Sequence, residues 1–296
     1  MSKSTFKNKR KGTLKAFGFS SPYIVWSLLF FVYPVVWLVV LIFIKWNFLN
    51  TPTWDGIHNI IRILTSDLFW ISIWNVFKFM LFYIPMVFIC SVLFALGLKK
   101  LKFGVLFVAI CFFIAQAAPG VGYSIVFQNI FSQDGAVNCF LLNYFNFTIP
   151  WFTSPTLAML SIAIMVTWKF VGFYGIILFS GMNGIPAPIY EAAEVDGSGK
   201  LRTLFKITIP LLNPQLVLIM VLAITLGFGI FTEVYMITGG GPLNSTMMPQ
   251  LVMYNTAFLQ LDPTFSATMA VAVAIISFIT IIVTRKIIER EVTLVA

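Results

Sequence analysis

Charge is scarce in this chain of 296 residues. Only 10% of the residues are charged, whereas 59% are hydrophobic, and the mean hydropathy is +0.96. A soluble domain carries about 25% charged and about 45–50% apolar residues. The composition therefore excludes a water-soluble globule and predicts an integral membrane protein whose apolar surface faces lipid. The net charge of +9 then indicates membrane orientation and not nucleic-acid binding.

Cysteine and histidine are also rare. Cys90, Cys111 and Cys139 lie in or near apolar segments without CxxC spacing, so they offer neither a disulfide framework nor a metal site. The single histidine, His58, has no partner at ligand spacing. The sequence lacks an HExxH motif, a serine–histidine–aspartate set and a paired-carboxylate site. We therefore expect neither a metal site nor enzymatic activity on this chain.

A phosphate-binding loop is missing as well. Gly199-Lys200 resembles the end of a Walker A motif, but that motif needs a Gly five residues earlier and a Ser or Thr after the Lys. Glu194 and Leu201 occupy those two positions. Any ATP that drives this protein is therefore expected on another chain.

Long apolar runs dominate what is present. A helix that crosses the hydrocarbon needs about 20 mostly apolar residues. We therefore expect an all-α integral membrane fold with six transmembrane helices. The expected domains are a basic cytoplasmic N-terminus (1–20), a transmembrane domain (21–290) and a cytoplasmic tail (291–296). The expected spans are residues 23–44, 73–98, 103–127, 157–182, 209–235 and 265–287.

Two of the spans contain helix-breaking residues. The third span contains a proline and two glycines within residues 118–122, and the fifth contains two glycines within residues 227–229. Breaks at membrane depth are tolerated where neighbouring helices or a wet cavity satisfy the backbone, and they often mark a substrate path. Close helix packing through small residues remains an equally good explanation. The first apolar run, 22–44, is too long for a signal peptide and has no cleavage site, so it is predicted to be an uncleaved span.

The distribution of Lys and Arg predicts the orientation. Basic clusters lie before the first span, between the second and third, between the fourth and fifth, and after the sixth. Six spans place all four clusters on one face, which is then cytoplasmic, as are both termini. The opposite loops, 132–155 and 238–264, contain neither Lys nor Arg. This agreement supports both the span count and the direction.

The loop at 184–208 is the most polar connection between spans. Pro188 suits the first turn of a helix, Glu191 and Glu194 follow, and Gly197 can end that helix in a left-handed conformation. A second short helix is predicted over 200–206. The loop is thus a compact helix–turn–helix that either serves as a tight connector or presents a low-relief surface to a partner.

A fixed spacing runs through this loop: Glu191-Ala192-Ala193, three residues, Gly197, nine residues, then Ile207 and, two and three positions on, Ile209-Pro210. It resembles the EAA signature of ATP-binding-cassette importer permeases, with Ile209 for the usual Leu and a Ser where sugar permeases usually have Ala after the Gly. The TGGGP…ST segment at 238–246 resembles a loop of the carbohydrate class, in particular the maltose/glycerol-3-phosphate F-type permeases. The wider likeness covers about residues 21–285.

The resemblance implies a sugar or oligosaccharide importer in a bacterial or archaeal cell membrane. Two permeases, usually a heterodimer of homologous chains, would form the pathway, with two ATPase subunits beneath them and an extracellular binding protein above. ATP and Mg would bind the ATPases, and rigid-body motion would open the cavity outward. The coupling positions that the resemblance assigns are Glu191, Ala192, Ala193, Asp196 and Gly197, of which Glu191 is expected to pair with a basic group on the ATPase.

Polar and aromatic residues within the spans are the candidates for the sugar path, because a sugar needs hydrogen-bonding groups and stacking faces. Lys169 and Glu233 stand out, since a charge at bilayer depth almost always faces the protein interior. They either pair with each other or contact substrate, and a structural role for Lys169 at the permease–permease interface is equally open. The full set is Asn75, Tyr83, Gln116, Gln128, Trp168, Lys169, Tyr174, Glu233 and Tyr235.

Other transport classes remain as alternatives. They are an importer for glycerol-3-phosphate or another non-sugar solute, a secondary carrier or channel, and a scaffold subunit that binds without transporting. A carrier would need coupling-ion carboxylates, for which only Glu233 is available.

Overall fold

The computed structural model describes residues 19–289. Its described residues divide into two compact units, one formed by residues 19–65 and 256–271 and the other by residues 66–255 and 272–289. We call them unit 1 and unit 2. The predicted basic N-terminus, apart from residues 19 and 20, and the predicted tail lie outside the described residues.

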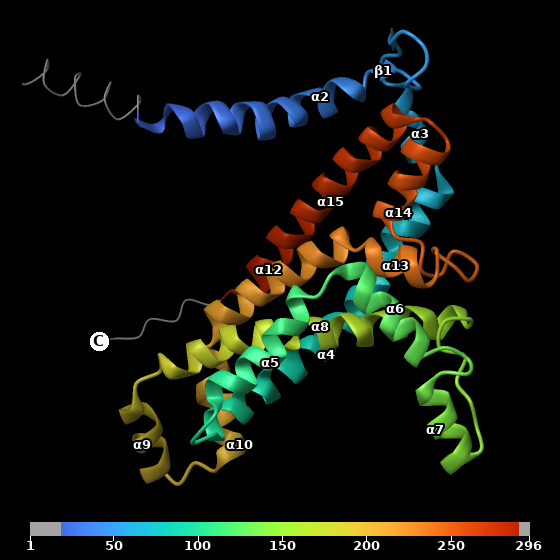
Figure 1. The fold of residues 1–296 in the computed structure, drawn as a ribbon. Coiled ribbons are helices and arrows are strands. Elements are labelled where there is room, and N and C mark those ends of the chain that lie inside the picture. The colour runs from blue at the N-terminus through green and yellow to red at the C-terminus, as the bar shows by residue number, and fades with distance from the viewer. Residues whose placement is uncertain (1–18, 290–296) are drawn as a thin grey trace, which may run out of the picture. The chain divides into compact units, whose positions relative to one another are not determined.

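Unit 1 begins with the apolar helix Phe19–Leu41, which includes a π-helical turn, η1 (Leu28–Val32), and α2 (Tyr33–Leu41) (Figure 1). A short antiparallel hairpin follows, made of β1 (Ile44–Lys45) and β2 (Thr53–Trp54). The next helix is α3 (His58–Leu64).

The hairpin and α3 are tied together by one buried amide. The Asn59 side chain donates from Nδ2 to the carbonyls of Ile42 and Ile44, at 3.2 and 3.1 Å. Buried carbonyls need such partners, so this single side chain fixes where the chain leaves the first helix.

The second chain segment of unit 1 contains the end of η3 (Asn255–Leu259) and the start of α15 (Pro263–Ile288). Asp262 caps α15, because its Oδ1 accepts from the Phe265 amide and from the Thr264 hydroxyl, each at 3.0 Å. Its Oδ2 accepts from Arg62 at 2.9 Å, and the Arg62 guanidinium lies 4.0 Å from the centre of the Phe265 ring. These contacts hold α3 to the start of α15.

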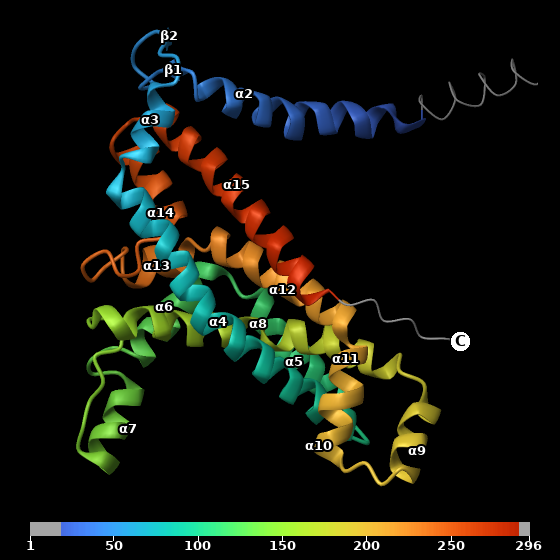
Figure 2. The ribbon, with the colours of Figure 1, turned by 180° about the vertical axis from the view of Figure 1, so that it is seen from behind.

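Unit 2 is built around two long helices that pack against each other, α4 (Asp67–Lys100) and α8 (Pro155–Asn183). The helix α5 (Val105–Ala117) packs on α8 beside them (Figure 2). Close approach requires a glycine here, because a Cβ at Gly172 would lie 2.5 Å from the backbone of Phe112 on α5. Small residues thus let the helices approach as membrane helices do.

The remaining elements connect or extend these helices. They are α6 (Gly120–Ile130), α7 (Ala136–Phe145), α9 (Ala187–Val195), α10 (Lys200–Thr203), η2 (Leu204–Thr208), α11 (Ile209–Leu211), α12 (Asn213–Gly229), α13 (Thr232–Ile237) and α14 (Pro249–Tyr254).

Both predicted breaks are confirmed. The third expected span consists of α5 and α6, which meet at Ala118-Pro119 with a bend of 98°. In the fifth, α12 ends at Gly229 and α13 begins at Thr232; there is a further bend of 70° between Leu211 and Asn213. Within residues 19–289, four helices are long and apolar enough to cross a membrane, or up to six if each bent pair counts as one span. The structure is therefore that of a multi-pass helical membrane protein.

Candidate functional site

A buried charged cluster lies where the two broken spans meet α8. Lys169 of α8 and Glu233 of α13 form an ion pair, with Nζ 3.7 Å from Oε1. The Tyr123 hydroxyl of α6 donates to the same Oε1 at 2.5 Å, and the Lys169 ammonium lies 4.1 Å from the centre of the Tyr123 ring. The two charged side chains are only 10% and 13% exposed. Direct pairing, one of the sequence-based alternatives for these charges, is thus present in the structure.

The breaks in the helices create this meeting point. The backbone leaves the helical conformation at Ile230 and Phe231, which turns the short helix α13 against α6. In the third span, the chain bends at Pro119 and α6 begins at the next residue, which places Tyr123 in the first turn of α6. Charges this deep in a membrane protein need partners, and the cluster supplies them from three elements.

A cavity of about 470 Å³ opens beside the cluster. Three predicted path residues line it: Gln116, Tyr174 and Glu233. Its wall is otherwise mostly apolar and aromatic, with one hydroxyl, which is typical of a small-molecule site. The other lining residues are Val166, Phe170, Phe173, Leu222, Thr225, Leu226, Gly229 and Ile230.

The other predicted path residues lie elsewhere in unit 2. The Asn75 amide donates to the carbonyls of Asn244 and Met247, at 2.8 and 3.0 Å, and so fixes the loop after α13. Gln128 lines a second cavity of about 490 Å³. Trp168 and Tyr235 are about half exposed and lie in aromatic clusters; Tyr83 is fully buried and stacks on Phe79.

Tyr123 is absent from the sequence-based set, although it contacts both charges. The sequence offered one signal for Tyr123: it lies one turn after the break at Pro119, and helix breaks often mark a substrate path. Lys78, a further charge within α4, was also missed; it is exposed and lines none of the cavities described here.

The polar loop at 184–208 forms the helix–turn–helix that its sequence predicts. In α9, Pro188 lies in the first turn, and Gly197 follows the last turn with φ +69°. The Gly197 amide donates to Glu194 O at 3.0 Å, and the Ser198 amide donates to Ala193 O at 2.9 Å, which is the Schellman pattern that ends many helices. A Cβ at Gly197 would meet nothing within 4 Å, so the left-handed backbone alone favours glycine there.

One face of this loop is held and the other is open. The Lys99 ammonium of α4 lies 4.2 Å from the centre of the Tyr190 ring, and the Tyr190 hydroxyl is 3.3 Å from Thr208 Oγ1. Ala193 is buried, whereas Glu191, Ala192, Asp196 and Gly197 are exposed. Three large apolar side chains that the sequence reasoning missed are also exposed: Val195 (88%), Leu201 (72%) and Phe205 (64%).

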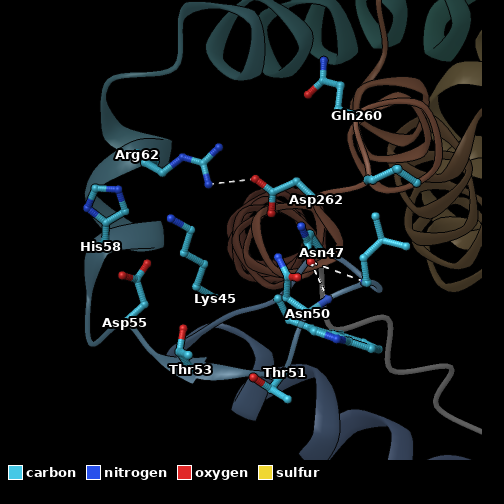
Figure 3. A pocket seen from close by; sticks show the side chains of 13 residues that line it. Lys45, Asn47, Asn50, Thr51, Thr53, Asp55, His58, Arg62, Gln260 and Asp262 are labelled. Carbon is cyan, nitrogen blue, oxygen red and sulfur yellow. Dashed lines mark hydrogen bonds and ion pairs between the residues drawn. The ribbon is translucent and has the colours of Figure 1, made fainter.

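Unit 1 contains a polar pocket of about 960 Å³ beside α3 (Figure 3). Lys45, Asp55 and His58 lie along one side of it, and the paired Arg62 and Asp262 lie across its upper part. Asn47, Asn50, Thr51, Thr53 and Gln260 add amides and hydroxyls. The described residues contain no group of three His, Cys, Asp or Glu side chains that could hold a metal ion.

Comparison with known proteins decides the family. Residues 16–292 match the family described as the binding-protein-dependent transport system inner membrane component. The chain belongs to this family. It is therefore a permease component of such a transport system. Membership of this family also supports the interpretation of its long apolar helices as transmembrane helices.

The permease is 30% identical to three curated relatives. One is the probable ABC transporter permease protein YesP of Bacillus subtilis, over 92% of this chain and 90% of the relative. Another is the sulfoquinovosyl glycerol permease SmoG of Agrobacterium fabrum, over 89% and 86%. The third is the lactose permease LacF of Rhizobium radiobacter, over 93% of each.

The fold is also that of a solved permease. A chain of a bacterial ABC transporter involved in the import of the acidic polysaccharide alginate superposes with a TM-score of 0.81. The match covers 96% of this chain and 98% of that one, at 18% identity. It shows a shared fold. A second structure of the alginate transporter, in complex with alginate pentasaccharide-bound periplasmic protein, gives a TM-score of 0.78 at 19% identity.

Proposed function

We propose that this permease is one transmembrane subunit of an ATP-driven, binding-protein-dependent importer for a sugar or oligosaccharide. The observation that carries the proposal is the capped helix α9, which presents a recessed alanine and an exposed Glu191 on a loop otherwise fixed to the transmembrane helices. The names of the relatives support the sugar class, since they include permeases for lactose, arabinooligosaccharides and trehalose/maltose. They do not favour the glycerol-3-phosphate or secondary-carrier alternatives.

The proposed topology has six spans with both termini in the cytoplasm of a bacterial or archaeal cell. Each bent pair then counts as one crossing, and the α9 loop lies on the same face as the basic clusters. The opposite face carries α7 and the TGGGP segment.

Energy reaches this chain through the α9 loop. This chain pairs with a second, homologous permease, and two ATPase subunits with bound ATP and Mg lie on their cytoplasmic side. Each ATPase receives the loop of one permease. Glu191, Ala192, Ala193, Asp196 and Gly197 form the contact, and the exposed Val195, Leu201 and Phe205 add apolar surface to it. Since Tyr190 joins the loop to α4 through Lys99, movement of α9 is passed to a helix that packs along α8.

The substrate passes along the cavity beside the charged cluster. Gln116 and Glu233 supply hydrogen-bonding groups, and Phe170, Phe173 and Tyr174 supply aromatic faces. The second permease completes this path. The binding protein meets the outer face, to which the polar pocket of unit 1 belongs under the proposed topology.

The test uses the complete transporter, reconstituted with its second permease, ATPases and binding protein in proteoliposomes. Glu191→Lys and Gly197→Pro are expected to abolish ATP-dependent sugar uptake while the complex still inserts. Glu289→Lys is the matched control, because Glu289 is also an exposed glutamate, and its ion pair with Arg285 is exposed and of small value. Wild-type uptake by correctly inserted Glu191→Lys and Gly197→Pro variants would refute the proposal, as would uptake by this chain alone without ATP.

A further inference from the structure

The charge balance of the cavity is uneven. Among residues 19–289, Glu233 is the only charged residue whose side chain lines it. Lys169 does not line the cavity: it is 8% exposed, and its ammonium lies over the ring of Tyr123. A molecule inside the cavity therefore meets the carboxylate before it meets the ammonium.

The two carboxylate oxygens of Glu233 differ in their hydrogen-bond partners. Oε1 accepts a hydrogen bond from the Tyr123 hydroxyl and is the oxygen nearest the Lys169 ammonium, at 3.7 Å. No residue between 19 and 289 donates a hydrogen bond to Oε2. A carboxylate oxygen can only accept, so the group that completes it must be a donor, such as a sugar hydroxyl.

No other cation is at hand for an acidic ligand. Lys78 of α4 is exposed and does not line this cavity, and the remaining lining residues are neutral. A carboxylate or sulfonate that entered would face the Glu233 charge with only neutral donors, those of Gln116, Tyr174 and Thr225, and with no unpaired cation from the described part of this chain. Like charges in a poorly hydrated site repel strongly.

We infer that Glu233 is a specificity-determining residue which makes the cavity select electroneutral, hydroxyl-rich sugars and reject acidic ones. Its free oxygen accepts a sugar hydroxyl, and its charge excludes anions; Lys169 and Tyr123 are positioning residues that hold it. This inference rests on the proposed sugar path. Two relatives of equal identity are named for lactose, which is neutral, and for sulfoquinovosyl glycerol, whose sulfonate is an anion. The inference predicts that this permease takes a solute of the neutral kind.

The binding protein has its own selectivity, so the experiment leaves it out. The complete membrane complex, with both permeases and both ATPases, is placed in nanodiscs without nucleotide. Sugar binding is measured by saturation-transfer difference NMR with four probes at equal concentration: lactose, maltotriose, sulfoquinovosyl glycerol and trigalacturonate. We expect the neutral probes to bind at least about tenfold more tightly than the anionic ones, a difference equivalent to about 1.4 kcal/mol.

Glu233→Gln keeps the shape and removes the charge, so it is expected to lower the neutral-to-anionic affinity ratio by about tenfold. Lys169→Met combined with Glu233→Gln removes both charges and guards against misfolding of the single variant; it should retain neutral binding and also lower the ratio. Glu289→Gln, far from the cavity in sequence and exposed, should leave the ratio unchanged.

The outcomes are distinguishable. Preferential binding of the anionic probes to the wild type, or a ratio that neither Glu233 variant changes, overturns the inference and leaves the proposed sugar path standing. Binding of none of the four probes by an assembled complex that hydrolyses ATP counts against the proposed path itself, and the inference falls with it.

Discussion

The helix Phe19–Leu41 and α8 are both long and apolar, yet they differ in what surrounds them. Phe19–Leu41 is the more apolar of the two, and none of its residues is buried by the rest of unit 1. The helix α8 is less apolar, but more than half of its apolar part is buried among the other helices of unit 2. Hydropathy therefore measures compatibility with lipid, while burial in this protein follows other features of the sequence.

Two such features separate the helices. In α8, Gly172, Gly175 and Gly181 approach neighbouring side chains or backbone so closely that a Cβ would lie within 3 Å of them. Phe19–Leu41 contains no glycine and no charged residue, whereas α8 carries Lys169. Small residues permit close contact, and a buried charge requires a partner on another helix. Substitutions can test each feature in turn.

The largest effect is expected for Gly172→Val in α8. The new Cβ would lie 2.5 Å from the carbonyl carbon and oxygen of Phe112, which are backbone atoms and cannot rotate away. We expect a loss of about 3 kcal/mol in the stability of the purified permease, at the upper end for overpacking, and poor accumulation in the membrane. Gly97→Val in α4 is the control, since nothing lies within 4 Å of its Cβ. Equal thermal shifts for the two variants would show that close packing does not distinguish α8.

A smaller effect is expected for Lys169→Met. It leaves the Glu233 carboxylate buried with only the Tyr123 hydroxyl, and removal of one member of a buried pair is costly. Because the Tyr123 hydroxyl still satisfies one carboxylate oxygen, we expect a loss of about 2 kcal/mol in thermal unfolding in detergent. Most of it should be recovered in the double variant Lys169→Met/Glu233→Gln. A double variant no more stable than Lys169→Met would mean that the ion pair does not hold α13 to α8.

Arg62→Ala tests whether unit 1 depends on its loop contacts. The Arg62–Asp262 pair is 39% and 26% exposed, so its own value is small, but the guanidinium also covers the Phe265 ring. We expect a loss of about 1 kcal/mol, detected as faster local hydrogen exchange at the start of α15. Lys45→Ala is the matched control, because Lys45 lines the same pocket and has no ion pair with a described residue. Equal exchange in both variants would contradict a clamp at Arg62.

The sequence was sufficient for local features of this fold. Runs of apolar residues located the helices, glycines and a proline located the breaks, and Gly197 located the end of α9, because each depends on a few neighbouring residues. The compact loop at 184–208 could be predicted for the same reason.

Contacts between distant residues could not be predicted in this way. Asn75 and Gln116 are both polar amides within apolar helices, but Asn75 satisfies the carbonyls of a loop about 170 residues away, whereas Gln116 lines the cavity. The direction of the 98° bend decides that Tyr123 meets Glu233, and no local pattern encodes that direction. The pocket of unit 1 likewise joins Arg62 to Asp262, which are 200 positions apart.

The smallest effect is expected for Val36→Ala in α2, where Val36 is 55% exposed. Lipid replaces the contacts that the two lost methyl groups made, so stability should change by less than about 0.3 kcal/mol. Val166→Ala in α8 deletes the same atoms at 1% exposure, where packed side chains and not lipid are the neighbours, and should cost about 1 kcal/mol. Thermal unfolding of the isolated permease compares the two directly. A loss at Val36 as large as that at Val166 would mean that Phe19–Leu41 has packing partners within the chain, and the contrast between the two helices would then disappear.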